Sequence, residues 1–547
     1  MPFADSVTET TREDLAATEE PASWRNMPNK LLLSTLAAAR ITELFSERSH
    51  AAYMFYQIRS FSPESQDSGS HIAAQSGILL ASWAAAQSLT AMWWGRVADS
   101  PKVGRKQVIL IGLTGTAMST MGIGFSRSFF SILIWKILAG GLNTNLGIMR
   151  SMIGEAIEHR FQSRAFLLLP MCLNVGELFG PLLGGFLTDP SVSINKIRDT
   201  SSQGTKGSGF KAKFPYALPN LTCALLIGVS ALVVIFALEE THPALQDKQD
   251  RGRRFGKWVY SRVLSNAYYK HRYQQLPRAD DVELSSPQVR ASDTDLFPGD
   301  SGRISTDSPI TSKEPDAVDL VSPTLGGSIL PRIVTRKVTL TLYTHHILML
   351  HFSTFMATIP SFLSAPRSAW TQPTKRSILH FSGGLEFSSG QVGIAMSFLG
   401  LAGLLFQLLV YPAVISKIGS LRSYRIFLLF SALSYILLPF LTLLPEKAVV
   451  LWPCLAIVLV FQALSRTFAL PCTIILVNNC SPEPSVRGTI HGLALSLGSA
   501  ARILGPLAGG WALGLGLEKD MVWGVWWCLS ALVGLNYILI SIIASID

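Results

Sequence analysis

Several ionisable side chains stand inside segments of this chain that are otherwise long and apolar. Arg40 and Glu43 are three residues apart and therefore share one face of a helix. A charge in apolar surroundings is costly unless it is paired or reaches water, so such residues mark functional sites. Buried carboxylates can bind and release protons, and arginines can hold an anion or pair with an acid. The residues with these properties are Arg40, Glu43, Lys136, Glu177, His351, Arg466 and Arg502.

Two interpretations of the first-half residues stay open. Arg40 and Glu43 pair with each other, or Glu43 is a carboxylate that binds a proton. Glu177 has no local partner in the sequence, and it forms a structural ion pair or takes part in proton or substrate binding. Lys136 has the same two alternatives, and a desolvated lysine can lose its proton.

The basic and histidine side chains of the second half have other expected uses. Arg466 and Arg502 are expected to hold an anionic substrate group or to pair with the acids of the first half. His345, His346 and His351 cluster in one segment, but a metal site needs several converging ligands and these do not share a helix face. No metal or other cofactor is therefore expected. The sequence holds no Walker, HExxH or GxSxG motif, so an enzyme is not expected either.

The segments that carry these residues are long enough to cross a membrane. Only 15% of the 547 residues are charged, and apolar stretches of about 20 residues, enough to cross about 30 Å of hydrocarbon, recur along the chain. Twelve are predicted, near residues 32–56, 72–94, 107–125, 129–149, 165–188, 216–238, 338–363, 391–413, 423–444, 449–476, 490–514 and 522–545. Charged residues interrupt the first of them. The expected fold class is an all-α polytopic membrane protein with twelve transmembrane helices.

Polar stretches divide the chain into parts. The first part of the longest stretch, Lys248–Arg278, is basic and aromatic, which predicts either a helix on an anionic leaflet or a solvated linker. Its second part, residues 280–331, is rich in Ser, Pro and Asp and predicts disorder. The expected parts are a disordered cytosolic tail at 1–30, a six-helix bundle at 31–238, a cytosolic central loop at 239–337 and a second six-helix bundle at 338–547.

The net charge of +10 is distributed over loops. Lys and Arg gather after the second, fourth and eighth apolar segments, which places these loops and both termini in the cytosol by the positive-inside rule. The basic loop between segments 5 and 6 opposes this orientation. The expected partners are the lipid bilayer, a small-molecule substrate and protons, with no nucleic acid, in a monomer. The expected location is the vacuolar or plasma membrane.

A glycine-proline motif occurs once in the fifth apolar segment of each half. It reads GPLLGG at 180–185 and GPLAGG at 505–510. Small residues let helix backbones approach closely, and interrupted segments at matching positions point to the moving parts of a duplicated membrane protein. The residues of this helix-packing motif are Gly176, Gly180, Pro181, Gly184, Gly185, Gly505, Pro506, Gly509 and Gly510.

The loop after the second segment reads GRVADSPKVGRK. It is similar to the G-x-x-x-D-x-x-G-R-K signature of the major facilitator superfamily, with two extra residues between Asp99 and Gly104. The glycine-proline motif resembles that of the antiporter branches, including drug:proton antiporters, and Lys136 stands where those branches usually have Arg. The resemblance implies two pseudo-symmetric six-helix bundles and a gating motif of Gly95, Asp99, Gly104, Arg105 and Lys106.

Further motifs resemble a fungal and plant subgroup that includes zinc-induced-facilitator-type proteins. They comprise Arg40 and Glu43, the Trp93–Arg96 stretch, Phe161–Phe166, Glu239–His242 and Gly488–Gly492. Relatives often have an Asp-Gln pair where this chain has Met356 and Ala357. The resemblance implies a secondary active transporter that moves a small organic solute by alternating access, coupled to proton antiport. The alternatives are a vacuolar or plasma-membrane exporter of a metal or metal chelate, and a non-transporting sensor with the same fold.

The first prediction concerns the gating motif. Asp99→Asn is expected to reduce transport strongly while expression and folding stay nearly unchanged, because charge pairs of Asp99 with Arg105 and Lys106 would stabilise one conformation. Solute flux and the size-exclusion profile of the purified variant test this together. Normal flux in the variant would remove the gating role.

Overall fold

The computed structural model describes a helical protein. One unit is formed by residues 1–256 with 332–547, and the other unit, 257–331, lies almost wholly outside the described residues. Most of the predicted tail at 1–30, most of the basic segment and the predicted disorder therefore fall outside the description, and Lys30 already begins α2. The described residues are 26–61, 69–188, 214–245, 250, 252–256, 258, 335–367, 383–445, 447–481 and 486–546.

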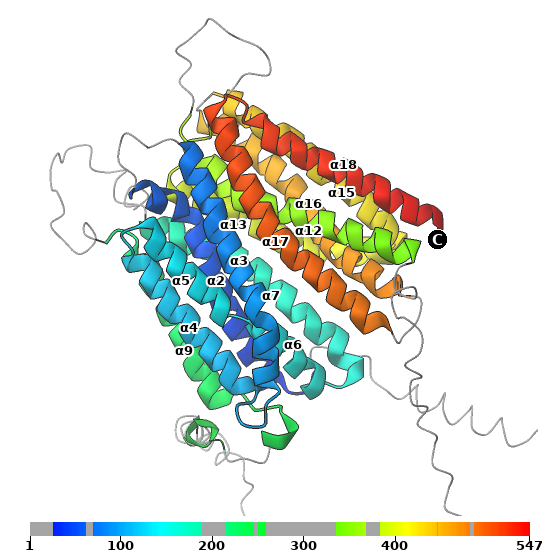
Figure 1. Ribbon diagram of the computed structural model, residues 1–547. Helices are drawn as coiled ribbons and strands as arrows, with labels where there is room; N and C mark the ends of the chain where they lie inside the picture. The colour runs from blue at the N-terminus through cyan, green and yellow to red at the C-terminus, as the bar shows by residue number, and fades with distance from the viewer. Residues whose placement is uncertain are drawn as a thin grey trace, which may run out of the picture. The chain divides into compact units, whose positions relative to one another are not determined.

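Each half of the helical unit crosses back and forth between two ends (Figure 1). The first half contains α2 (Lys30–Arg59), α3 (Gly69–Ala98), α4 (Arg105–Phe125), α5 (Phe129–Leu142), α6 (Asn145–Ala156), α7 (His159–Thr188) and α9 (Ala217–Ala237). The second half contains α12 (Arg336–Ser364), α13 (Ser389–Leu405), the π-helical turn η5 (Phe406–Val410), α14 (Tyr411–Ile418), α15 (Ser420–Leu437), the 3-10 turn η6 (Leu438–Leu443), α16 (Ala448–Asn479), α17 (Arg487–Glu518) and α18 (Trp523–Ile546). We call the end that carries the 99–104 loop the inner end, and the opposite end the outer end.

Local sequence fixes several helix starts. Ser388 forms a capping box with Gln391 at the start of α13, and the Ser128 hydroxyl accepts a hydrogen bond from a backbone amide in α5. Gly104 and Gly419 precede α4 and α15 with φ of 78° and 76°, a backbone conformation that favours glycine. These two glycines lie at matching places in the two halves.

Ten helical segments of the described chain are long and apolar enough to cross a membrane. The other two predicted spans correspond to α2 and α3, which have 30 residues each. Charged residues such as Glu43 and Glu47 interrupt α2, and Ala, Ser and Gln lower the hydropathy of α3. The membrane crossing of these two helices stays a prediction.

The fourth predicted segment is not one continuous helix. It divides into α5 and α6 because Asn143 and Thr144 leave helical geometry, with ψ of 92° and 17°. Neighbouring helices replace part of the lost hydrogen bonding, as a break within a membrane requires. Gln87 of α3 donates to the Asn143 carbonyl at 2.7 Å, and the Asn143 amide donates to the Thr116 hydroxyl of α4 at 3.3 Å.

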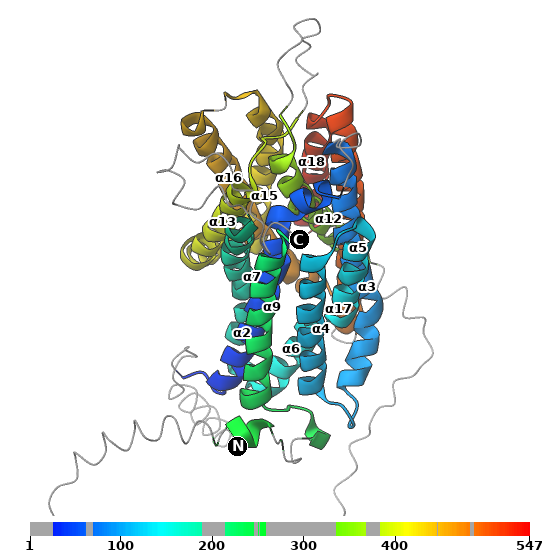
Figure 2. The same cartoon turned by 90° about the vertical axis from the view of Figure 1, so that its left-hand side faces the viewer.

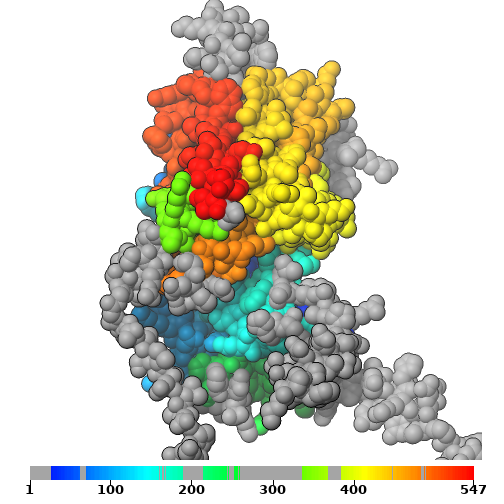
Figure 3. Space-filling model, turned by 90° about the vertical axis from the view of Figure 1, so that its right-hand side faces the viewer, coloured from blue at the N-terminus to red at the C-terminus, as the bar shows by residue number. Residues whose placement is uncertain are grey.

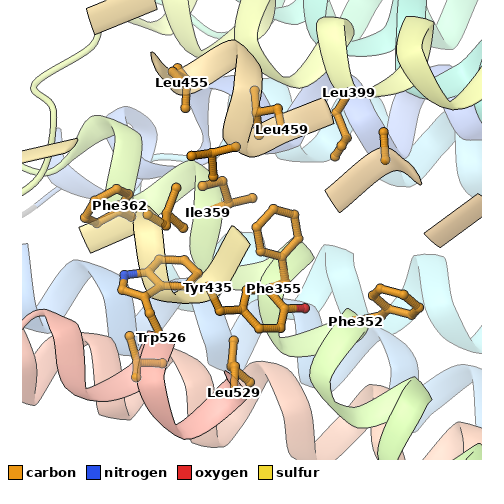
Figure 4. Packing of buried hydrophobic residues seen from close by; sticks show 14 of the residues in the cluster. Phe352, Phe355, Ile359, Phe362, Leu399, Tyr435, Leu455, Leu459, Trp526 and Leu529 are labelled. Carbon is orange, nitrogen blue, oxygen red and sulfur yellow. The ribbon is translucent and has the colours of Figure 1, made fainter. Parts of the chain in front are cut away.

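Large aromatic side chains fill the core of the second half (Figure 4). The Trp526 ring lies 5.3 Å from that of Phe362, and the Phe355 ring lies 5.7 Å from that of Tyr435. These four side chains are almost completely buried. They join α12, α15 and α18 into one packed body.

Two helix pairs connect the halves, α3 with α17 and α7 with α13 (Figures 1 and 2). A Cβ added to Gly510 would lie 2.7 Å from the Ala73 carbonyl oxygen and 3.0 Å from the Gly77 Cα. A Cβ added to Gly185 would lie 3.1 Å from the Gly390 Cα. Backbone therefore meets backbone at both crossings, which only very small side chains permit.

The glycine-proline motifs also pack inside their own halves. A Cβ at Gly180 would lie 2.8 Å from the Arg48 Cβ of α2, and one at Gly184 would meet the Ser49 carbonyl. In the second half, a Cβ at Gly505 would meet the Ser353 hydroxyl of α12. The other motif residues follow the same pattern: Gly176 faces Leu44, Gly509 faces Thr354 and Thr358, and the carbonyls of Pro181 and Pro506 face Gly393 and Gly77. Each motif helix thus contacts the first helix of its own half and the second helix of the other half.

The halves share packing at the outer end and have separate cores at the inner end. Near the outer end, Met54 and Ile58 of the first half cluster with Ala365 of the second. One described inner-end cluster contains first-half residues only, and another contains second-half residues only. In Figure 3 the residues of the two halves (lime to red, and blue to green) gather in distinct blocks. The described halves are therefore joined at the outer end and parted at the inner end.

The second prediction concerns the close helix crossings. Gly180→Leu and Gly505→Leu are each expected to destabilise the protein by about 1–3 kcal/mol or more, because the added side chain has no space. The thermal midpoint of the purified protein measures this. Gly228→Leu and Gly534→Leu are the controls, since nothing lies within 4 Å of a Cβ at either position. Normal midpoints for both motif variants would refute the close-packing argument.

Candidate functional site

A buried ionic cluster joins the two halves at the middle of the helices. The Glu177 carboxylate of α7 accepts two hydrogen bonds from Arg466 of α16, one of them at 3.0 Å. Arg48 of α2 approaches the same carboxylate at 3.5 Å. Glu177 is 3% exposed and Arg466 is 9% exposed. Because two guanidinium groups from opposite halves meet one carboxylate, this cluster ties α7 to α16.

Amide side chains extend the cluster toward α13. Asn174 accepts from Arg466 at 3.3 Å and donates to Gln407. Gln407 lies in the π-helical turn η5, and such turns occur often at functional sites. Within this turn the Gln407 side chain meets Asn174 of α7. Sequence periodicity gave no indication of this turn.

Arg466 and Arg502 were expected to hold an anionic substrate group or to pair with the acids of the first half, and Arg466 contacts Glu177. Arg48 was not among the predicted site residues. Arg48 also approaches Glu47 at 3.6 Å. A signal was present, because Arg48 and Glu47 are as exceptional in an apolar helix as Arg40 and Glu43 are.

A second polar cluster lies between α2 and α6. Arg40 donates a hydrogen bond to Glu43 at 3.2 Å. This contact is the pairing that one of the two interpretations of the sequence expected. Glu43 is 3% exposed and also accepts a hydrogen bond from Asn145. The Asn145 side-chain amide has space here because residue 112 of α4 is a glycine, and a Cβ on Gly112 would overlap that amide. Glu43 is therefore a buried carboxylate next to the break between α5 and α6.

Arg502 extends this second cluster from the other half. It donates to the Gln87 side-chain oxygen and to the Ser499 hydroxyl, each at 3.4 Å. Gln87 in turn bonds the Asn143 carbonyl. A single side chain thus connects the Arg502 guanidinium with the broken helix. Arg502 and Arg150 of α6 are both exposed at this place.

Two other predicted residues lie apart from these clusters. Lys136 is buried, and among the described residues it has no hydrogen-bond partner. His351 is completely buried, and its Nδ1 lies 3.0 Å from the Tyr435 hydroxyl, to which Gln462 donates. This network sits among buried residues of the second half, and a role of His351 in binding stays a prediction. The described residues contain no group of three His, Cys, Asp or Glu side chains able to hold a metal ion.

The predicted gating loop is anchored within the first half. Arg105 pairs with Glu155 of α6 and lies 3.4 Å from Asp99, whose side chain is 70% exposed. Glu240 accepts from the backbone amides of Arg105 and Lys106 at 3.1 and 3.0 Å, so it caps the start of α4. The Asp99 contact is the weakest of these charge pairs, because it is exposed to solvent. Open space surrounds Gly95.

Asp250 binds the same loop from the segment after α9. Its carboxylate accepts from Lys106 at 2.5 Å and from the Gly252 amide at 2.9 Å. Partial burial alone would raise the pKa of Asp250, but the hydrogen bonds from Lys106 and from the backbone amides of Arg253 and Gly252 lower the pKa below its ordinary value. This contact therefore persists above the ordinary pKa of aspartate and is lost as the pH falls through the lowered value.

Comparisons with known proteins agree with this architecture. A family model described as Major Facilitator Superfamily matches residues 70–371. The major facilitator superfamily multidrug transporter mfsB of Aspergillus fumigatus is 29% identical over 523 residues, which cover 92% of this chain and 81% of that protein. Protein ZINC INDUCED FACILITATOR 1 of Arabidopsis thaliana is 22% identical over 464 residues, covering 84% and 79%. The resemblance to a fungal and plant subgroup is thereby confirmed.

A solved structure supports the fold. The human organic anion transporter MFSD10 has a TM-score of 0.53 and 16% sequence identity, and the match covers 94% of this chain and 99% of that one. At this identity the likeness concerns the fold alone.

The third prediction concerns the ionic cluster. Arg466→Met is expected to destabilise the protein by about 3–5 kcal/mol, because it leaves Glu177 with one guanidinium partner in a buried place. The double variant with Glu177→Gln should be more stable than the sum of the single effects predicts, by about 1 kcal/mol or more. Thermal midpoints of the four proteins give this coupling.

Arg502→Met is the matched control, because the described contacts of Arg502 do not include Glu177. Its effect should add to that of Glu177→Gln. Additivity in the Arg466 cycle as well would show that the bridge carries no stability.

Proposed function

This chain belongs to the major facilitator superfamily, and from that premise we propose that it is a secondary active transporter that exchanges a small organic solute for protons by alternating access. Its membrane-transport function follows from the family. The proton coupling and the class of solute are the proposal. The transported solute is drawn from the side at which the helices are parted, which the positive-inside rule makes the cytosol.

The observation that carries the proposal is the distribution of contacts between the halves. Backbone-to-backbone crossings at Gly77 and Gly185 close the outer end, while the described inner-end cores stay separate. The bridge from Glu177 to Arg466 lies between them and connects the halves directly. Rigid halves with one closed end and a breakable central bridge are the elements that alternating access requires.

Glu43 is the carboxylate that we assign to the proton. Arg40 is its one close cationic partner, and Asn145 donates to its other oxygen. Glu177, in contrast, is held between two guanidinium groups, which oppose its protonation. Glu47 is the further acid whose charge acts on Glu43. A carboxylate with a single cation, next to the break in α5 and α6, is better suited to exchange a proton for a solute.

The class of solute is inferred from the relatives. The Aspergillus protein carries the name of a multidrug transporter, so an organic solute that leaves the cytosol is the function best supported. Reconstitution of the full chain into proteoliposomes, with a fungicide panel as substrates, tests this. Accumulation that requires an imposed pH gradient supports antiport, and flux without that dependence indicates facilitated transport. Complete lack of flux for all solutes would favour the sensor alternative.

The fourth prediction concerns Glu43. Glu43→Gln mimics the protonated form, so it is expected to abolish pH-driven uphill transport while solute exchange at equal pH continues. Both modes are measured in the same proteoliposomes. Glu177→Gln is the comparison, and it should impair both modes because it weakens the bridge between the halves. Full gradient-driven accumulation by the Glu43 variant would exclude this residue as the coupling site.

A further inference from the structure

The break between α5 and α6 leaves buried polar atoms without partners. Among the described residues, the Asn143 Oδ1 and the Thr144 Oγ1 have no hydrogen-bond partner, although these residues are only 6% and 9% exposed. The Asn145 Oδ1 has none either, but it lies against Gly112. An unsatisfied buried oxygen costs about 1–3 kcal/mol. Two such oxygens on adjacent residues indicate a site that a donor group of a ligand completes.

The same break presents the start of a helix within the bundle. Helix α6 has 12 residues, and no side chain caps its first turn. The amide groups at a helix start attract anions. Gln87 places the Arg502 guanidinium beside this start, because it bonds the Asn143 carbonyl at 2.7 Å and Arg502 at 3.4 Å.

Positive charge exceeds negative charge around the break. Arg150 lies close enough to Arg40 and Arg502 for the charges of both to act on it. The nearby acids Glu43 and Glu47 already have cationic partners. Glu43 is paired with Arg40. Glu47 contacts Arg48, although its charge also acts on Arg502. The described hydrogen bonds of Arg502 go to the neutral Gln87 and Ser499. A surplus of guanidinium groups that face one another is stabilised by an anion.

We propose that the α5–α6 break, with Gln87 and Arg502, binds a carboxylate-bearing solute that also carries a hydroxyl or amino group. The carboxylate lies between Arg502 and the start of α6, where guanidinium and amide donors face it. The hydroxyl or amino group donates to the oxygens of Asn143 and Thr144. A metal cation does not fit this place, because Arg40, Arg150 and Arg502 would repel it.

The site also explains coupling across the halves. Arg502 belongs to α17 of the second half, whereas Asn143 and Thr144 belong to the first half. A solute held by both would be contacted by each half at once. Protonation of Glu43 would release Arg40 from its pair and change the charge that the solute meets. This inference rests on the proposed function, because it names the solute class of that transporter.

The test is an equilibrium binding measurement without any gradient. Purified full-length protein in detergent is titrated with 4-hydroxybenzoate, benzoate and 4-hydroxybenzamide, which differ only in the hydroxyl or in the charge, and the thermal midpoint is followed. The expected order of affinity is 4-hydroxybenzoate, then benzoate, then 4-hydroxybenzamide. Arg502→Gln should weaken both carboxylates by about tenfold or more.

Thr144→Val should lower the affinity for 4-hydroxybenzoate toward that for benzoate and leave the affinity for benzoate unchanged. Arg422→Gln is the matched control, because Arg422 is an exposed arginine in the first turn of α15. It should leave all three affinities unchanged. The proposal is overturned if neither carboxylate shifts the midpoint, if 4-hydroxybenzamide binds as tightly as 4-hydroxybenzoate, or if Arg502→Gln binds both carboxylates normally.

Flux distinguishes failure of this site from failure of the proposed function. If the protein transports fungicides in proteoliposomes but binds none of the three probes, the proposed function stands and the proposed site is refuted. If the protein binds the carboxylates through Arg502 but transports no solute, the proposed site stands and the proposed function is refuted.

Discussion

The contact on which the arrangement of the two halves depends is the buried bridge between Glu177 and Arg466. Replacing water around a carboxylate and a guanidinium is costly, and the pair is stable only when further polar partners complete it. Arg48 and Asn174 supply these contacts from the first half. Because the bridge needs partners from both halves, it forms only when α7 and α16 are close. It therefore belongs to one conformation and must break or change partners when the halves separate.

The glycine crossings make that conformation possible. At Gly400 an added Cβ would lie 2.6 Å from the Glu177 backbone, so α13 passes directly beside the residue that carries the bridge. Bulkier side chains would hold α7 and α13 apart and move Glu177 away from Arg466. Close packing of the backbone and ionic pairing of the side chains are thus two requirements of one interface.

Sequence reasoning identified the features that repeat and missed those that depend on tertiary contact. The two glycine-proline motifs were recognisable because spacing and composition are conserved between the halves of one chain, and the packing of Gly180 and Gly505 follows from them. The break at Asn143 was not predicted, because its residues lie in an apolar run and contacts from other helices, such as those of Gln87 and Thr116, help to make it stable. The partners of an intramembrane charge likewise depend on which helices meet, and periodicity within one helix does not contain that information.

The duplicated motif carries opposite charges in its two copies. Glu177 stands three residues before Gly180, and Arg502 stands three residues before Gly505. The backbone around both is similar, since each motif helix packs against the first helix of its own half and the second helix of the other half. Glu177 is satisfied by two arginines, whereas the described hydrogen bonds of Arg502 go to neutral groups. One copy of the motif therefore holds the halves together by an internal pair, and the other presents an arginine whose charge is not neutralised by a direct contact. In the proposed transporter, this asymmetric charge on a symmetric scaffold would separate the closing of the interface from the recognition of a ligand.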